Sequence, residues 1–182
     1  MTFETLATQG NQIIYGSMAA SIGIRVHEIR NEVIKDSFSD FRKSPHRLEY
    51  VANVHGIEFI NDSKATNINS TWFSLECMTK PIIWIVGGLN KGVDFEALKF
   101  LVCKKVKAII WLGKDTQQFH SCFGELGLPI AHTESLKEAV ETAYYAGKDG
   151  DVVLLSPASP SFDLFNDYEE RGDEFKRLVD TL

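Results

Sequence analysis

Asn61-Asp62-Ser63-Lys64-Ala65-Thr66-Asn67 is the stretch around which the chain is organised. The apolar run 56–60 leads into it, and a segment of helical character, 70–78, follows it. A strand that ends in a polar loop and opens into a helix is a common place for an anionic ligand. The free N–H groups and the dipole at a helix start favour negative charge there. The pattern therefore predicts a binding loop in an α/β protein.

The side chains of this loop suit an anion only in part. Lys64 supplies a positive charge, and Ser63 and Thr66 supply hydroxyl donors. Asp62 has the wrong sign for a phosphate, so we expect its partner to be a sugar hydroxyl, a metal or a basic side chain. The same residue types also serve as ordinary turn and cap residues. Spacing alone leaves the functional and the structural interpretation open.

Bulk composition places the chain among soluble globular proteins. Its 182 residues suffice for one well-buried domain with little left for a second. Hydrophobic residues make up 44% and charged residues 24%, which is ordinary. The net charge is −6 and no dense Lys/Arg block occurs, so we do not expect nucleic acid as a partner.

Cellular location is also constrained by the sequence. No apolar run approaches the length of a membrane span, and the first residues do not form a signal peptide pattern. Cys77, Cys103 and Cys122 are far apart and form no C-x-x-C pair. That spacing argues against a disulfide framework or a zinc site. We therefore expect a cytoplasmic protein with no metal site of its own.

From residue 48 onward the apolar pattern alternates between strand and helix. A turn at His55-Gly56 predicts a hairpin. The near-continuous apolar run 82–86 is typical of a strand buried on both faces. We expect strands at 48–54, 57–60, 82–86, 108–112, 130–131 and 152–155, and helices at 70–78, 95–102, 116–126, 136–146 and from the 156–163 loop to about 182. The predicted fold is a Rossmann-like α/β domain. Its mostly parallel sheet has an antiparallel edge hairpin strand and helices on both faces.

Ligands of such sheets bind beyond the carboxyl ends of the strands. That rule places four polar loops on one rim, namely 62–67, 87–95, 113–115 and 156–163. Lys91 is the only cation of its loop, and beside Lys64 it becomes a candidate carboxylate clamp. The pattern G-x-x-x-x-G-K-[ST] is absent from the chain, so the loop is not a P-loop.

Before this domain, residues 11–41 have helical periodicity, and helices of this size have little core of their own. Ser44-Pro45 breaks the helical pattern, because a residue before proline disfavours the α region. We expect a domain boundary there. Residues 1–43 would then be a helical remnant of a preceding domain, and 44–182 a compact domain.

Four stretches together resemble the carboxy-terminal domain of the Mur ligases. They occur in that family's order and cover 44–182 well: 45–49 (PHRLE), 61–67 (NDSKATN), 87–95 (GGLNKGVDF), and 154–158 (LLSPA) through 169–172 (EERG). By this resemblance, 1–43 closes the central, ATP-binding domain. Where the family carries asparagines that hold adenine, this chain has Ile13 and Gly16, so that role is not transferred.

The resemblance implies an activity. It is closest to the branch of the family that uses ATP to add D-glutamate to UDP-N-acetylmuramoyl-L-alanine in peptidoglycan precursor synthesis. The resembled enzymes carry their P-loop in the central domain, which also holds most of the Mg²⁺ ligands. We therefore expect this chain to be inert alone, and a monomer that works with its own central and N-terminal domains.

The resemblance also implies roles for single residues. For D-glutamate it points to Lys64, Thr66, Lys91, Ser161, Phe162 and Tyr168, with Lys64 also as a catalytic residue. For ATP it points to His46, Arg47 and Asp62. The 156–163 loop, stiffened by Pro157 and Pro160, would hold the incoming amino acid.

Two alternatives remain open. One is the equivalent domain of another Mur ligase or of a folylpolyglutamate synthase. The other is a Rossmann-like binding module without catalysis.

Overall fold

The computed structural model describes residues 44–89, 94–114 and 117–182. The expectations for the helical remnant 1–43 and for Lys91 lie outside these residues. The described elements are β1 (Glu49–Val54), β2 (Ile57–Asn61), α4 (Ile68–Cys77), β3 (Ile82–Gly87), the 3₁₀ turn η1 (Glu96–Leu98), α5 (Lys99–Lys105), β4 (Val106–Leu112), α6 (Gln117–Phe123), the 3₁₀ turn η2 (Gly124–Leu126), β5 (Ile130–Thr133), α7 (Leu136–Ala146), β6 (Val152–Ala158) and α8 (Tyr168–Val179).

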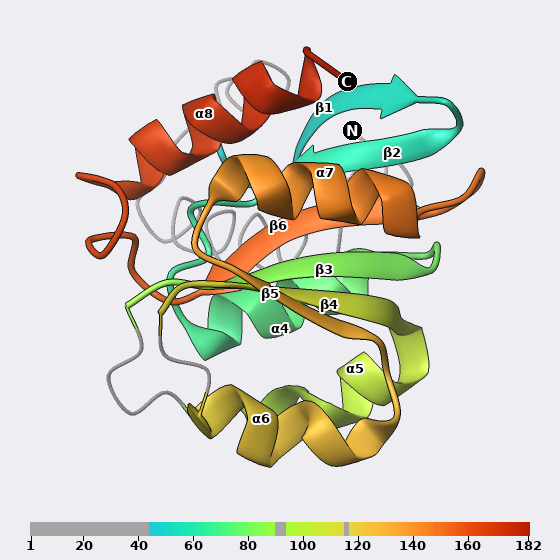
Figure 1. The fold of residues 1–182 in the computed structure, drawn as a ribbon, viewed down its shortest axis with the longest axis vertical. Coiled ribbons are helices and arrows are strands. Elements are labelled where there is room, and N and C mark those ends of the chain that lie inside the picture. The colour runs from blue at the N-terminus through green and yellow to red at the C-terminus, as the bar shows by residue number, and fades with distance from the viewer. Residues whose placement is uncertain (1–43, 90–93, 115–116) are drawn as a thin grey trace, which may run out of the picture. The chain divides into compact units, whose positions relative to one another are not determined.

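The strands form one six-stranded sheet in the order β1-β2-β6-β3-β4-β5. β1 pairs antiparallel with β2, and all the other pairs are parallel. The fold prediction is therefore confirmed, with the hairpin strand at one edge. The chain runs outward from β3 to β5 and then crosses back, so that β6 lies between β2 and β3 (Figure 1). The strand order thus reverses between β3 and β6, which is where open α/β sheets bind ligands.

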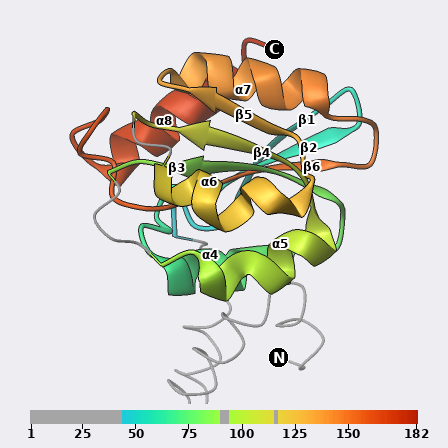
Figure 2. The same cartoon turned by 60° about the horizontal axis from the view of Figure 1, so that its bottom comes forward.

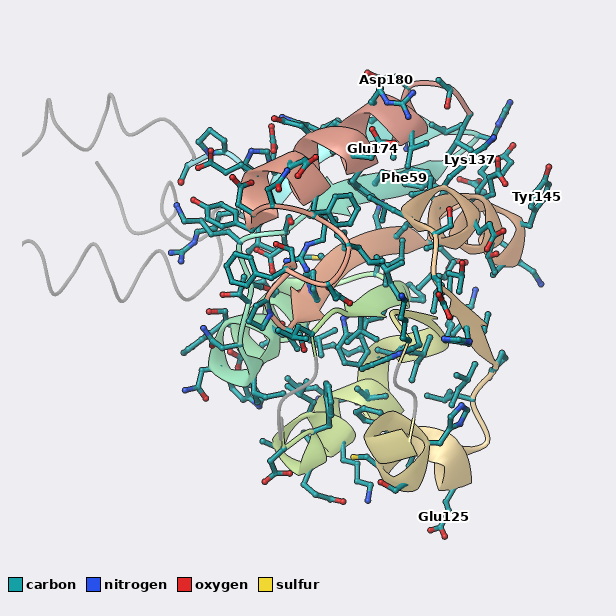
Figure 3. The ribbon with its side chains drawn as sticks, turned by 60° about the vertical axis from the view of Figure 1, so that its left-hand side comes forward. Phe59, Glu125, Lys137, Tyr145, Glu174 and Asp180 are labelled. Atoms are coloured by element: carbon teal, nitrogen blue, oxygen red, sulfur yellow. The ribbon has the colours of Figure 1, made fainter. Side chains whose placement is uncertain are left out.

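Helices cover both faces of the sheet (Figure 2). Because side chains alternate along a strand, β3 sends Trp84 to one face and Ile83 and Ile85 to the other. The Trp84 face packs against α4, α5 and α6. The opposite face packs against α7 and α8, where Phe59 of β2 lies 6.4 Å from Phe175 between ring centroids (Figure 3). The sheet is thus buried on both sides, as its apolar strands require.

Two elements differ from their predicted bounds near the rim. β6 continues through Pro157 to Ala158, although proline cannot donate to a ladder. The strand tolerates it because the described pairing with β2 ends at Leu155 and the register with β3 shifts between Ile85 and Gly87.

The last helix begins only at Tyr168, so the expectation that it follows the 156–163 loop directly was wrong. Asp167 caps it by accepting a hydrogen bond from Glu170 N at 2.8 Å. Ser161 instead opens a turn, in which its carbonyl accepts hydrogen bonds from Leu164 N and Phe165 N. Asp163 lies in that turn region. No helix in the described residues is long and apolar enough to span a membrane.

Candidate functional site

The loops after β2, β3 and β6 meet at the carboxyl rim, as the sequence predicts. Ala158 N donates to Ala65 O at 2.9 Å, which ties the end of β6 to the loop after β2. Leu89 N donates to Pro160 O at 3.0 Å, which ties the loop after β3 to the loop after β6. Gly88, at φ 128°, makes this second approach possible, because a Cβ there would overlap Pro160 O. The close approach at this glycine is therefore to protein backbone.

The first residue of the 61–67 stretch points into the domain. Asn61 is fully buried, and its Oδ1 accepts a hydrogen bond from Ser63 N at 3.1 Å. Its Nδ2 lies 3.0 Å from His46 Nδ1 and 3.2 Å from Gly172 O. The two backbone partners define the orientation of the amide, so Nδ2 faces the His46 ring and also donates to Glu49 Oε2 at 3.1 Å. Asn61 thus holds the His46 ring in one orientation.

Asp62 is the second inward-pointing residue. Its Oδ1 accepts from Leu48 N at 3.2 Å, and its Oδ2 accepts from Ser74 Oγ at 2.5 Å and Ser156 Oγ at 2.8 Å. Burial raises the pKa of this carboxyl to about 6, against the opposing effect of these hydrogen bonds and of the Arg47 charge. The carboxylate joins the 45–48 segment, α4 and β6 from beneath the rim.

Ser63 completes the inward-pointing set. It is fully buried, and its hydroxyl donates to Tyr168 O at 2.7 Å. The same oxygen accepts a hydrogen bond from Arg171 Nε at 2.9 Å. Asn61, Asp62 and Ser63 therefore act as anchors of the loop, and the residues after them reach the surface.

Lys64 and Thr66 are the half-buried residues that this anchored loop presents. Lys64 Nζ donates to Ser44 Oγ at 3.2 Å and lies 5.5 Å from the Tyr168 ring centroid, in cation–π range. An ammonium has three N–H donors, so donors remain for a ligand. Thr66 lines a pocket of about 320 Å³ at the start of α4 together with Ala158. Asn67 caps that helix by accepting from Ser70 N at 3.0 Å.

The remaining predicted amino-acid contacts come from the chain after β6. Ser161 is buried, Phe162 is 70% exposed beside it, and Tyr168 starts α8 with its carbonyl bonded to Ser63. Tyr168 is thereby brought to the Lys64 loop, whereas the placement of Lys91 is not described. Their assignment as ligand contacts stays a prediction.

The predicted nucleotide residues lie in and beside the 45–48 segment. His46 is buried at 5% exposure, its backbone is at φ 60°, and its ring lies edge-on to Tyr168 at 6.2 Å between centroids. Arg47 is half-buried, and its charge acts on the Asp62 carboxyl. The side chains of His46 and Asp62 are engaged inside the domain, while Arg47 is the more accessible of the three. Their nucleotide contacts also stay predictions.

Sequence reasoning missed Arg171, Asn61 and the anchoring role of Ser63. Arg171 carried a detectable signal, because it shares one helical stripe with the buried Phe175 and Leu178. A charged residue on an apolar stripe has to find partners inside the domain. Among residues 44–89, 94–114 and 117–182, no three His, Cys, Asp or Glu side chains gather to hold a metal ion.

Gly172→Ala should test how the His46 ring is seated. A Cβ on Gly172 would overlap His46 Nδ1. Overpacking of this kind costs about 1–3 kcal/mol, against a gain of about 0.5–1 kcal/mol from replacing a helical glycine. We expect a net loss of stability in urea unfolding followed by tryptophan fluorescence. Gly124→Ala is the matched control, because nothing lies within 4 Å of its Cβ position. Equal stability of the two variants would contradict this seating.

The fold and rim together define an α/β domain whose loops converge at the β3–β6 reversal of strand order. Within that class, a sequence profile described as "Mur ligase, glutamate ligase domain" matches residues 46–159. The chain belongs to this family.

Curated relatives align with the whole chain. UDP-N-acetylmuramoylalanine–D-glutamate ligase of Bacteroides thetaiotaomicron is 46% identical over 183 residues, covering 100% of this chain and 41% of the relative. The ligase of the same name from Porphyromonas gingivalis is 46% identical over 98% of this chain and 40% of its own length. The chain thus spans about two fifths of the relatives it matches.

Solved structures share the fold at low identity. UDP-N-acetylmuramate-alanine ligase MurC from Thermotoga maritima matches with a TM-score of 0.66 at 12% identity, over 94% of this chain and 38% of that one. E. coli FolC in complex with ADP matches with a TM-score of 0.57 at 15% identity, over 84% of this chain and 35% of that one. At these identities the likeness shows the fold alone.

Proposed function

We propose that residues 44–182 form the C-terminal, amino-acid-binding domain of an ATP-dependent ligase that adds D-glutamate to UDP-N-acetylmuramoyl-L-alanine. The observation that carries the proposal is the 46% identity along the whole chain with ligases named for this reaction. The protein would act in peptidoglycan precursor synthesis in the cytoplasm and support cell shape and division. Residues 1–43 would close its central domain.

The proposed reaction has two steps. The carboxylate of UDP-N-acetylmuramoyl-L-alanine attacks the γ-phosphorus of ATP, giving an acyl phosphate and ADP. The amine of D-glutamate then attacks the acyl carbon, the C–O bond to phosphate breaks, and an amide and inorganic phosphate form. The amine gives up one proton in this step, which passes to the departing phosphate or to water. ATP brings Mg²⁺, which we expect to be held mainly by the central domain.

The contribution proposed for this domain is to hold a dianionic amino acid with its amine aimed at the acyl carbon. Lys64, Thr66 and Ser161 come from the two rim loops tied together at Ala65 and Ala158. Lys91, Phe162 and Tyr168 would complete the D-glutamate pocket. Positioning of this kind can supply roughly 7–11 kcal/mol of a reaction barrier, so a rigid frame beneath the loops is a functional requirement.

The nucleotide is proposed to meet this domain at the 45–48 segment. Arg47 suits a phosphate, because its guanidinium can form a forked pair with phosphate oxygens. His46 and Asp62 would act with it, since Asp62 accepts a hydrogen bond from Leu48 N and Asn61 orients the His46 ring. These contacts would favour a closed arrangement of the intact enzyme only if the nucleotide interacts more favourably with the closed state than with the open one.

A substrate panel on the full-length protein tests the proposal. With ATP, Mg²⁺ and UDP-N-acetylmuramoyl-L-alanine, we expect ADP release that depends on D-glutamate and not on L-glutamate, meso-diaminopimelate or L-lysine. The folate alternative is tested with a reduced pteroate and L-glutamate. If an amide forms with one of the other amino acids or with the reduced pteroate, and none forms with D-glutamate, the protein is another Mur ligase or a folylpolyglutamate synthase. If the protein binds ATP and D-glutamate but forms no product, the alternative that remains is a Rossmann-like binding module without catalysis.

A further inference from the structure

Arg171 is a buried cation to which neither the amino acid nor the nucleotide has been assigned. It lies in the first turn of α8 and is 1% exposed. Burial lowers the pKa of its guanidinium to about 10, while the Asp163 charge acts in the opposite direction. The group therefore remains cationic at neutral pH, and its desolvation has to be offset by hydrogen bonds.

The hydrogen bonds of Arg171 join two rim loops. Nε donates to Ser63 Oγ at 2.9 Å and Nη2 donates to Ser63 O at 2.8 Å, so one edge of the guanidinium binds a single residue through two hydrogen bonds. Nη1 donates to Ser159 O at 3.3 Å. Ser63 immediately precedes Lys64, and Ser159 lies two residues before Ser161. A single planar group therefore spans the loop that presents Lys64 and the loop that presents Ser161.

Asp163 does not accept a hydrogen bond from the guanidinium of Arg171. Its charge acts on Arg171, yet the guanidinium hydrogen bonds of Arg171 in the described part of the chain all go to serine oxygens of the loops. Asp163 Oδ1 is buried and finds no hydrogen-bond partner among the described residues. An arginine retained only as an ion-pair partner would direct its fork at the carboxylate. This one is directed at the loops.

We propose that Arg171 is a positioning residue, which sets the spacing between Lys64 and Ser161 and so the width of the amino-acid pocket. The inference rests on the ligation proposed above. Lysine cannot replace arginine in this role, because an ammonium is a compact point charge that cannot reproduce the planar fork. Arg171→Lys therefore keeps the buried charge and removes the bridge.

The test compares Arg171→Lys with Arg177→Met in the full-length protein. Arg177 is on the same helix, exposed and paired with Glu174 through Nε at 2.7 Å, so it is a matched arginine away from the rim. A displacement of about 1 Å can cost on the order of 100-fold in rate. We expect Arg171→Lys to raise KM for D-glutamate and to lower kcat/KM for it by about 10- to 100-fold, with KM for the UDP-linked substrate unchanged. Arg177→Met should behave as wild type.

A merely structural role would give a different result. Partial unfolding would lower kcat in proportion to the folded fraction and leave KM for D-glutamate unchanged, which would overturn the inference. If Arg171→Lys does not fold, Ser63→Ala takes its place, since it removes the partner of Nε while keeping the arginine. An unchanged KM for D-glutamate in Ser63→Ala would then overturn the inference.

Coupling to the pocket gives a second measurement. Ser161→Ala should cost less in the Arg171→Lys background than in wild type, because a displaced Ser161 has less contact left to lose. Additive effects would count against positioning. Wild-type protein without D-glutamate-dependent product would refute the proposed function itself. Active wild type with an unaffected Arg171→Lys would refute only the role of Arg171.

Discussion

The wild-type chain should lose roughly 2–3 kcal/mol of unfolding free energy through Asp62 alone as the pH rises from about 4 to about 7, and Asp62→Asn should lack this loss. The pKa of the carboxyl rises from 3.8 to about 6 on folding because the group is buried. The folded state therefore holds a proton that the unfolded state has released. Its stabilising effect is complete below pH 3.8, declines across the interval, and is absent above the folded pKa.

The asparagine variant is suited to this comparison. Its Oδ1 can still accept from Leu48 N, and its Nδ2 can donate to the hydroxyls of Ser74 and Ser156. Urea unfolding at several pH values, followed through the buried Trp84 and Trp111, gives the stability difference between wild type and variant. Asp180→Asn, at an exposed carboxyl, is the surface control. If the stability difference between wild type and Asp62→Asn does not change with pH, this carboxyl is not buried as described.

Lys64→Ala in the full-length protein should reduce kcat/KM for D-glutamate by roughly 10- to 150-fold, since a charge-assisted contact contributes about 1.5–3 kcal/mol. Asn61, Asp62 and Ser63 anchor the loop by their own side chains, so the backbone at Lys64 should survive the substitution. The loss should therefore fall on substrate use and leave the unfolding free energy nearly unchanged.

Lys137→Ala is the matched control for Lys64→Ala. Lys137 is on α7, 68% exposed, with a long 3.9 Å contact to Glu141 (Figure 3). Exposed pairs of this kind contribute about 0–1 kcal/mol. Steady-state kinetics with each substrate varied in turn provide the measurement. Wild-type kinetics in Lys64→Ala would show that Lys64 does not contact D-glutamate. Thr66 would then be the next residue of this loop to test.

The sheet and its rim could be predicted from local pattern. The run 82–86 is typical of a strand buried on both faces, and β3 is that strand. His55-Gly56 marked the hairpin, which pairs β1 with β2. Each polar loop follows an apolar strand, and parallel strands bring their carboxyl ends to one edge. The location of the candidate site therefore followed from sequence before any contact was known.

The orientation of the side chains in the 61–67 stretch could not be predicted from the sequence. Asp62 and Lys64 are two residues apart in one polar loop, yet Asp62 accepts hydrogen bonds inside the domain and Lys64 reaches the rim. Nothing local separates them, because the partners of Asp62 are Leu48, Ser74 and Ser156.

By itself, the sequence determined the fold class, the hairpin, the rim and the family, since these depend on periodicity and on motifs read along the chain. Only the tertiary structure decided that β6 lies between β2 and β3, and that Arg171 grips Ser63 across 108 residues of sequence. Such contacts depend on which distant segments become neighbours. Side-chain periodicity records which face of an element is buried, and it carries no record of the partner that buries it.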